Sequence, residues 1–259
     1  MERSTQYSRI SLAIDGQVAR LGLKHPPLNV IDIAMMEELT EALGEIESHR
    51  KVAVLVISGA KNSFSAGADA AAHKPERMQD MLSKFHTVIR ALLKTSKVTV
   101  ATVQGHCLGG GAELAMVCDL VYTTESSRWG FPEIKLGFYP PVACAGLAAL
   151  VGVKRAAEFV LTGRVVGGCE AAQVGLATRA VPDDQIASCI DGCVQDLLKL
   201  SPAALAFTKK AFYAWDAMHF DKGLAKAEHL CLEELMHTED ASEGINAFLE
   251  KREPQWKGK

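Results

Sequence analysis

The segment VAVLVISG, residues 52–59, places the strongest constraint on the fold of this chain, because it is an almost unbroken run of apolar and β-branched residues. Such a run is typical of a strand that is buried on both faces of a sheet. KVTVATVQG at 97–105 and DLVYTTE at 119–125 also read as strands. Between these runs, apolar residues recur at helical spacing from Glu76 to Lys94. Strands that alternate with helices predict an α/β architecture with largely parallel strands.

The two ends of the chain carry other local signals. Asp15-Gly16 lies between two short strand-like runs and predicts a hairpin turn. Asp32 precedes an amphipathic stretch and is expected to cap a helix. From residue 201 onward all patterns are helical. We therefore predict an α/β core over residues 1–200 and a helical C-terminal region over residues 201–259.

Composition narrows the classes of function. The 259 residues carry a formal net charge of −3 and no basic tail, which argues against a nucleic-acid partner. Seven cysteines at scattered spacings indicate reduced thiols in a cytoplasmic protein, and eight histidines without an HExxH or HxxxH pattern predict no metal site. The chain has neither an apolar run of membrane-spanning length nor the apolar N-terminal stretch of a signal peptide, so no membrane partner is expected.

Three consecutive glycines, Gly109 to Gly111, stand between a strand-like run and a helix that carries Glu113. The GxGxxG pattern of a dinucleotide-binding loop does not fit the surrounding segment GHCLGGGAEL. A tight turn and an oxyanion hole both remain open. Backbone N–H groups at a helix N-terminus can hold a developing negative oxygen, and glycine lets a substrate approach them. The segment FSAGAD, residues 64–69, supplies a second turn of small residues after a strand.

A second acid, Glu133, follows Pro132 and lies twenty residues after Glu113. A single glutamate in a sequence is most often a solvated side chain. Two acids that flank a pair of such turns favour chemistry on an enolate, because that chemistry needs paired groups for proton transfer.

Four segments together resemble the enoyl-CoA hydratase/isomerase, or crotonase, superfamily: FSAGAD, GHCLGGGAELAMVCDLVY, WGFPEIKLGFYP and TEDASEGINAFLEKR. The resemblance runs from about residue 10 to the end of the chain. It implies a spiral α/β core of repeated ββα units, followed by C-terminal helices that mediate trimerisation. The expected assembly is a homotrimer, or a homohexamer of two stacked trimers. The implied substrate is an acyl-CoA thioester, and no separate cofactor is expected because CoA is part of the substrate.

The resemblance also implies roles for individual residues. The family's oxyanion hole matches the backbone N–H groups of Ala68 and Gly110, and its two catalytic acids match Glu113 and Glu133. Family analogy makes Glu133 the proton donor to carbon and Glu113 the group that holds water, an order that the sequence itself leaves open. Lys251 is expected to approach the nucleotide phosphates. The family's CoA-binding stretch matches Ala66, Gly67, Ala68 and Asp69, and Gly110 is expected to contact the substrate with it.

Two positions depart from the usual pattern of the superfamily. Pro141 stands where a glycine is common, and Phe131 replaces a polar residue. Both changes predict a more apolar acyl pocket, with His73 at its border, although neutral drift explains them equally well. Four segments, NVIDIAMMEELTEAL, the stretch from GAD to His73, GFYPPVACAG and LEELMHTEDASEGINAFLEKR, look most like cyclohexa-1,5-diene-1-carbonyl-CoA hydratases, which act in anaerobic benzoyl-CoA degradation.

The resulting expectation is a hydro-lyase that adds water to a conjugated enoyl- or dienoyl-CoA thioester, with the cyclic diene as the expected substrate. A general trans-2-enoyl-CoA hydratase of fatty-acid β-oxidation is the first alternative. An enoyl-CoA isomerase is the second, since isomerases often manage with one acid. Some members of the superfamily bind RNA, but the acidic net charge of this chain argues against that class.

Overall fold

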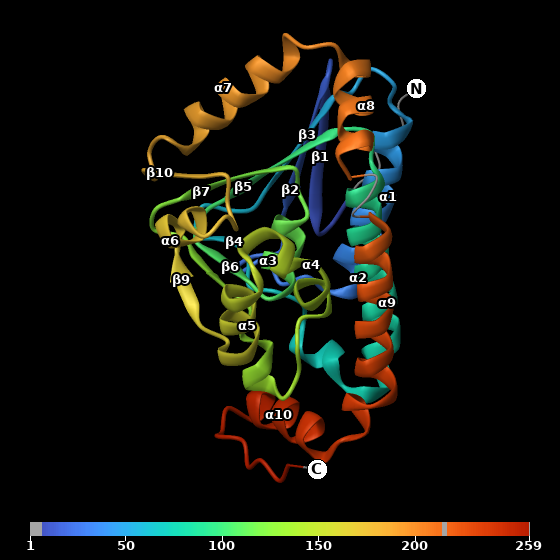
Figure 1. Cartoon of the computed structure of the whole chain (residues 1–259), viewed down its shortest axis with the longest axis vertical. Helices are drawn as coiled ribbons and strands as arrows, with labels where there is room; N and C mark the ends of the chain where they lie inside the picture. Colours follow the sequence, from blue (N-terminus) through green and yellow to red (C-terminus); the bar gives the residue numbers. More distant parts are fainter. Residues whose placement is uncertain (1–6, 214–216, 259) are drawn as a thin grey trace.

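The structure of the chain is a computed structural model that describes residues 7–213 and 217–258. Within these residues the strands form two sheets, a larger one of six strands and a smaller one of four (Figure 1). The strands are β1 Ile10–Asp15, β2 Val18–Leu23, β3 Val54–Ser58, β4 Ser63–Ser65, β5 Val98–Val103, β6 His106–Leu108, β7 Leu120–Thr124, β8 Arg128–Gly130, β9 Val165–Gly167 and β10 Arg179–Val181.

Helices cover both sheets. The α-helices are α1 Ile33–Ser48, α2 Pro75–Lys94, α3 Gly110–Met116, α4 Pro141–Val151, α5 Val153–Thr162, α6 Gly168–Gln173, α7 Ile186–Leu198, α8 Pro202–Tyr213, α9 Ala217–Glu233 and α10 Glu239–Glu250. Short 3-10 helices are η1 Ala70–His73, η2 Pro132–Leu136 and η3 Leu235–His237.

The larger sheet has the strand order β1-β2-β3-β5-β7-β10. β1 and β2 form the expected antiparallel hairpin, and Gly16 in its turn has a positive φ of 57°. The remaining neighbours pair in parallel. The strands predicted from the three apolar runs, now β3, β5 and β7, lie side by side in the middle of this sheet.

Side chains of β3 point alternately into two hydrophobic cores. Leu55 and Ile57 belong to the main core, which α1 and α2 also line. Val54 and Val56 pack instead in a smaller cluster with residues of α7. Figure 1 shows α7 on one side of the sheet and α1 and α2 on the other. The expectation of a strand buried on both faces is therefore confirmed.

The smaller sheet has the order β4-β6-β8-β9. Each of β3, β5 and β7 leads into a short strand of the smaller sheet and then into helical structure. This is the repeated ββα unit that the family resemblance implies. Because β4, β6 and β8 pair in parallel, the segments that follow them leave the sheet at the same edge.

The C-terminal helices pack on the core. α9 lies against α4 and α2, and α10 lies against η1 and η2, at the lower end of the molecule in Figure 1. The division of the chain at residue 200 remains a prediction. Within the described ranges no helix combines the length and the hydrophobicity required to cross a bilayer.

Asp32 caps α1, as the sequence predicts. Its Oδ1 accepts a hydrogen bond from the backbone N–H of Met35 at 2.8 Å, and its Oδ2 pairs with Nε of Arg9 at 2.8 Å. Burial opposes ionisation of this carboxyl, but the hydrogen bonds from Arg9 and Met35 outweigh it and lower the pKa of Asp32. One side chain thus fixes the start of α1 and ties it to the segment before β1.

Replacing Asp32 with alanine removes both contacts, and we expect D32A to lower the free energy of unfolding by at least about 1 kcal/mol. D32N is the matched control, because asparagine keeps the capping acceptor and loses the charge. Urea unfolding of the two variants measures the difference. If D32A and D32N are equally destabilised, the cap does not contribute and the effect belongs to the ion pair.

Candidate active site

Two backbone N–H groups meet at the edge of the smaller sheet, one after β4 and one after β6. Ile31 donates to the carbonyl of Gly67 at 2.9 Å and accepts from the N–H of Asp69 at 3.1 Å, which fixes the backbone on both sides of Ala68. Among the backbone hydrogen bonds of the described residues, none uses the N–H of Ala68. The N–H of Gly110 begins α3 and so has no acceptor inside that helix.

The Ala68 and Gly110 segments are in contact. A Cβ atom placed on Gly110 would lie 3.3 Å from the backbone nitrogen of Ala68. The two free N–H groups that the sequence predicts as an oxyanion hole therefore come from adjoining segments. Their role as donors to a thioester oxygen remains a proposal.

Each of the three consecutive glycines answers a separate steric demand. Gly109 has a φ of 51°, and a Cβ atom there would collide with Oε1 of Glu133. A Cβ atom on Gly111 would lie 2.7 Å from the side chain of Ser65. The glycines thus let α3 begin against β4 and let a carboxyl group lie directly on the backbone of the turn.

Glu113 is held by the start of another helix. It lies on α3 with 3% of its surface exposed. Its Oε1 accepts hydrogen bonds from the N–H groups of Val142, at 2.9 Å, and Ala143, at 3.0 Å. Burial raises the pKa of Glu113 to about 7, and the two amide donors, which favour the charged form, limit the rise.

Glu133 lies on η2, 7% exposed, in a different environment. Its Oε2 is buried and has no hydrogen-bond partner among the described residues. Burial, and after it the negative charge of Glu113, raises the pKa of Glu133 well above its ordinary value. At neutral pH Glu133 is therefore the protonated member of the pair, and Glu113, with its two donors, is the member that ionises.

Both acids line a small cavity of about 20 Å³. Its walls are formed by Ala68, His73, Met81, Leu82, Phe85, Gly110, Glu113, Glu133, Phe138, Pro140 and Pro141. The structure thus brings together both predicted acids, both predicted amide segments and His73. The space has room for about one water molecule, so an acyl group enters only when the surrounding side chains move.

One expectation about the acyl pocket needs correction. Phe131 does not line the cavity: it is fully buried and packs edge to face on Phe159 of α5, with ring centroids 6.2 Å apart. Pro141 lines the cavity, and it is the first residue of α4. At that position a helix has no use for the missing N–H, and the next two N–H groups point to Glu113.

Sequence reasoning missed these two amide donors, Val142 and Ala143. A signal was available, because proline at the first position is typical of a helix start. The sequence did not say which group the helix would face.

Most backbone N–H groups of the predicted CoA-binding stretch already donate hydrogen bonds within the protein. The N–H of Ala66 donates to Leu28 at 2.9 Å, and that of Gly67 to the hydroxyl of Ser65 at 3.1 Å. The N–H of Asp69 is also used, as described above. Contact of this stretch with CoA remains a prediction, as does the approach of Lys251, which ends α10 with a φ of 56°.

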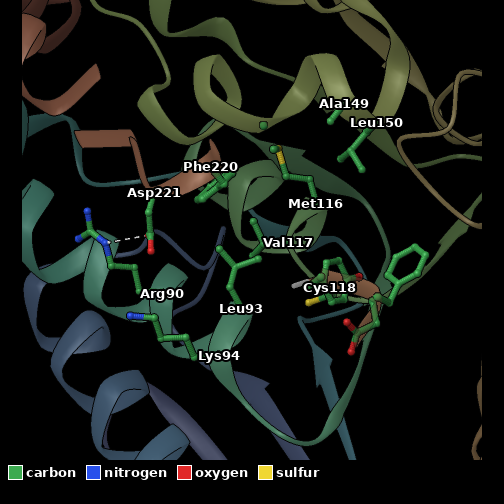
Figure 2. Close-up of a pocket in the computed structure, with 14 residues that line it drawn as sticks. Arg90, Leu93, Lys94, Met116, Val117, Cys118, Ala149, Leu150, Phe220 and Asp221 are labelled. Carbon is green, nitrogen blue, oxygen red and sulfur yellow. Dashed lines mark ion pairs between the residues drawn. The ribbon is translucent and has the colours of Figure 1, made fainter. Parts of the chain in front are cut away.

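A larger cavity, of about 560 Å³, lies elsewhere in the described structure (Figure 2). It opens beside the C-terminal ends of α2 and α3, where Phe220, Met116 and Leu150 provide apolar walls and Arg90 pairs with Asp221 at 3.7 Å. Neither Glu113 nor Glu133 lines it. No group of three or more metal-ligating side chains occurs within the described parts of the chain.

Known proteins resemble this chain over nearly its whole length. Cyclohexa-1,5-dienecarbonyl-CoA hydratase of Thauera aromatica is 31% identical over 259 residues and is covered completely, as is this chain. A probable enoyl-CoA hydratase of Bacillus subtilis (strain 168) is 32% identical, with 96% of this chain and 98% of the relative covered.

Solved structures agree. The crystal structure of an enoyl-CoA hydratase from Mycobacterium avium subsp. paratuberculosis K-10 superposes with a TM-score of 0.88 at 26% identity, covering 97% of this chain and 100% of that one. An enoyl-CoA hydratase/isomerase from Xanthobacter autotrophicus Py2 gives 0.87 at 28% identity, covering 95% and 94%. The model of the Enoyl-CoA hydratase/isomerase family matches residues 13–259, a span that includes both turns and both acids, and the chain therefore belongs to that family.

Proposed function

We propose that the protein adds water to a conjugated acyl-CoA thioester, and that its substrate is cyclohexa-1,5-diene-1-carbonyl-CoA. One observation carries the proposal: two buried carboxyl groups in different surroundings line the same cavity as Ala68 and Gly110, whose backbone N–H groups have no acceptor among the described backbone groups. The name of the Thauera relative supports the cyclic substrate. The apolar walls, which include Phe85 and Phe138, are compatible with a ring.

In this mechanism the thioester oxygen accepts hydrogen bonds from the N–H groups of Ala68 and Gly110. The conjugated β-carbon becomes electrophilic, and the negative charge that develops on the oxygen during attack is stabilised. Such donors act strongly in a dry site, where the loss of one typically costs about 2.7–4 kcal/mol of transition-state stabilisation.

The two carboxyl groups divide the proton transfers. Ionised Glu113 accepts a proton from the attacking water, and protonated Glu133 delivers a proton to carbon. The difference between their environments supports this order, since Glu113 has two amide donors and Oε2 of Glu133 has none among the described residues. A proton must then return from Glu113 to Glu133 before the next turnover.

A general trans-2-enoyl-CoA hydratase is the second candidate. The Bacillus subtilis relative is as similar to this chain as the Thauera relative and is named a probable enoyl-CoA hydratase. Overall identity therefore does not separate the two substrates, and the same two acids serve both reactions. The presence of both acids argues against an isomerase that needs one.

A homotrimer or homohexamer is the assembly we propose. Large apolar side chains are exposed on two helices of the single chain: Val153 and Leu161 on α5, and Phe207 and Phe212 on α8, each at least 70% exposed. Burial of these side chains between copies of the chain would remove apolar surface from water.

Hydration of crotonyl-CoA and of cyclohexa-1,5-diene-1-carbonyl-CoA, measured in parallel, tests the substrate. We expect kcat/KM to be at least tenfold higher for the cyclic diene, because the apolar walls contact a ring over a larger area. Product mass and chromatography identify the hydroxy thioester. Preference for crotonyl-CoA would establish the second candidate, and inactivity on both would overturn the proposed hydration.

The pH dependence of hydration follows from the protonation states. Because the pKa of Glu113 is about 7 and the base must be ionised, we expect kcat/KM to fall about tenfold per pH unit below pH 7. The pKa of Glu133 lies higher, so a decrease at high pH is expected where this acid loses its proton. A stopped assay over pH 5 to 10 measures both limbs.

Glutamine variants test whether Glu113 and Glu133 are the groups responsible for the pH dependence. E113Q and E133Q should each lose about 10²-fold to 10⁴-fold in kcat. E41Q, at an exposed glutamate of α1, is the matched control and should keep the activity of the parent. Full activity in either E113Q or E133Q would contradict the two-acid mechanism.

Gly109 provides a steric test of the site. We expect G109A to lose at least about tenfold in kcat, because the methyl group would push Glu133 away and alanine strongly disfavours a φ of 51°. G44A is the control, since a Cβ atom at Gly44 in α1 meets no neighbour. Circular dichroism checks that both variants fold. If G109A keeps its activity while folded, the close contact with Glu133 is not required.

A further inference from the structure

His73 is a third polar group in the cavity, and its ring is held in one orientation. Its Nδ1 lies 2.8 Å from the backbone carbonyl oxygen of Asp69, and its edge packs against Phe138 with ring centroids 5.0 Å apart. The side chain is 5% exposed. It ends η1, which leads from the Ala68 segment into α2.

The bond to Asp69 defines the tautomer. A carbonyl oxygen can only accept a hydrogen bond, so Nδ1 carries the proton and donates it. Burial lowers the pKa of His73, although its contact with Asp69 opposes this, and the ring is neutral at neutral pH. Nε2 is then a lone-pair acceptor, and no hydrogen bond in the described part of the chain uses it.

The other side chains that line the cavity provide few hydrogen-bond acceptors besides Nε2 of His73. Of the residues that line the cavity, only His73, Glu113 and Glu133 have polar side chains. A water molecule in the cavity has two hydrogens to donate. Glu113 accepts one of them, and Glu133, being protonated, has its O–H available as a donor. A neutral imidazole nitrogen is a much stronger base than the carbonyl oxygen of a protonated carboxyl group.

We propose that Nε2 of His73 accepts the second hydrogen of the reacting water and, after addition, the hydroxyl hydrogen of the product. This inference rests on the proposed hydration and assigns a further substrate-contacting residue to it. His73 orients the oxygen lone pair toward the β-carbon and exchanges no proton.

The atoms balance without a contribution from His73. The water oxygen forms a bond to the β-carbon and gives one hydrogen to Glu113 as a proton. Glu133 gives its proton to a carbon of the conjugated system, where the electrons of the double bond are taken up. The remaining O–H stays on the product and keeps its hydrogen bond to Nε2. In the reverse reaction, dehydration, the same nitrogen binds the hydroxyl of the β-hydroxy substrate.

A comparison of two reactions at the same site tests the proposal. Hydration consumes water as a reactant. Exchange of solvent deuterium into the α-carbon of butyryl-CoA requires the backbone donors and a carboxyl group, but adds no water. H73F keeps an aromatic ring against Phe138 and removes the acceptor. H73Q puts an amide oxygen close to the position of Nε2 and therefore restores an acceptor.

We expect H73F to lower the rate of hydration at least about tenfold relative to the rate of exchange, and H73Q to recover most of the ratio. H86F is the matched control: His86 is also buried, pairs with Glu228 through Nδ1, and does not line the cavity. H86F should lower the thermal midpoint and leave the ratio within about twofold.

The outcomes separate the two proposals. If H73F lowers hydration and exchange equally, His73 only supports the fold of the site, and its assignment to water is overturned while hydration stands. If H73F leaves both rates unchanged, the assignment is also overturned. If the parent protein exchanges deuterium but hydrates neither crotonyl-CoA nor the cyclic diene, the proposed hydration falls and the role of His73 falls with it.

Discussion

Two carboxyl groups buried in one small apolar space are the constraint around which this site is built. Both cannot be charged at neutral pH, since burial and mutual repulsion raise the cost of the second charge. The protein separates them by their surroundings: two N–H groups of α4 bind Glu113, while no described group bonds to Oε2 of Glu133. One acid and one base thus arise from the same side chain type, and the rest of the site depends on this difference.

Close packing of backbone makes the arrangement possible. Parallel pairing of β4, β6 and β8 brings three segments to one edge, and each contributes a part of the site: Ala68, Gly110 and Glu133. A side chain on Gly111 would collide with β4 at Ser65, and one on Gly109 would displace the carboxyl group of Glu133. Glycine loses more conformational entropy on folding than other residues, and at these positions that cost is offset because a larger residue would collide with its neighbours.

The sequence predicted what is local or periodic. The apolar run from Val52 to Ile57 contains a buried strand, Asp32 caps its helix, and Asp15-Gly16 turns the hairpin. The glycine turn was also found, because it lies between a strand-like run and a helix, and both acids were found through their positions near the two turns of small residues and through the family resemblance. Their chemical roles remain proposals.

Contacts made by distant elements could not be predicted in this way. No local pattern predicts that the first free N–H groups of α4 bind Glu113. Ala143, one of these donors, lies thirty residues after Glu113 in the chain. Phe131 lies two positions before Glu133, yet it faces the core against α5, and sequence proximity to an acid does not reveal this direction. The tautomer of His73 similarly follows from a backbone carbonyl whose orientation only the folded turn defines.

The attachment of Glu113 to α4 couples proton affinity to helix position. α4 packs along α5 and α9, and these neighbours determine where its first turn lies. A displacement of α4 by a fraction of an ångström would lengthen both hydrogen bonds and make the carboxylate more basic. Substitutions where α4 packs on α5 or α9 would therefore change the proton affinity of Glu113 without altering any residue of the cavity.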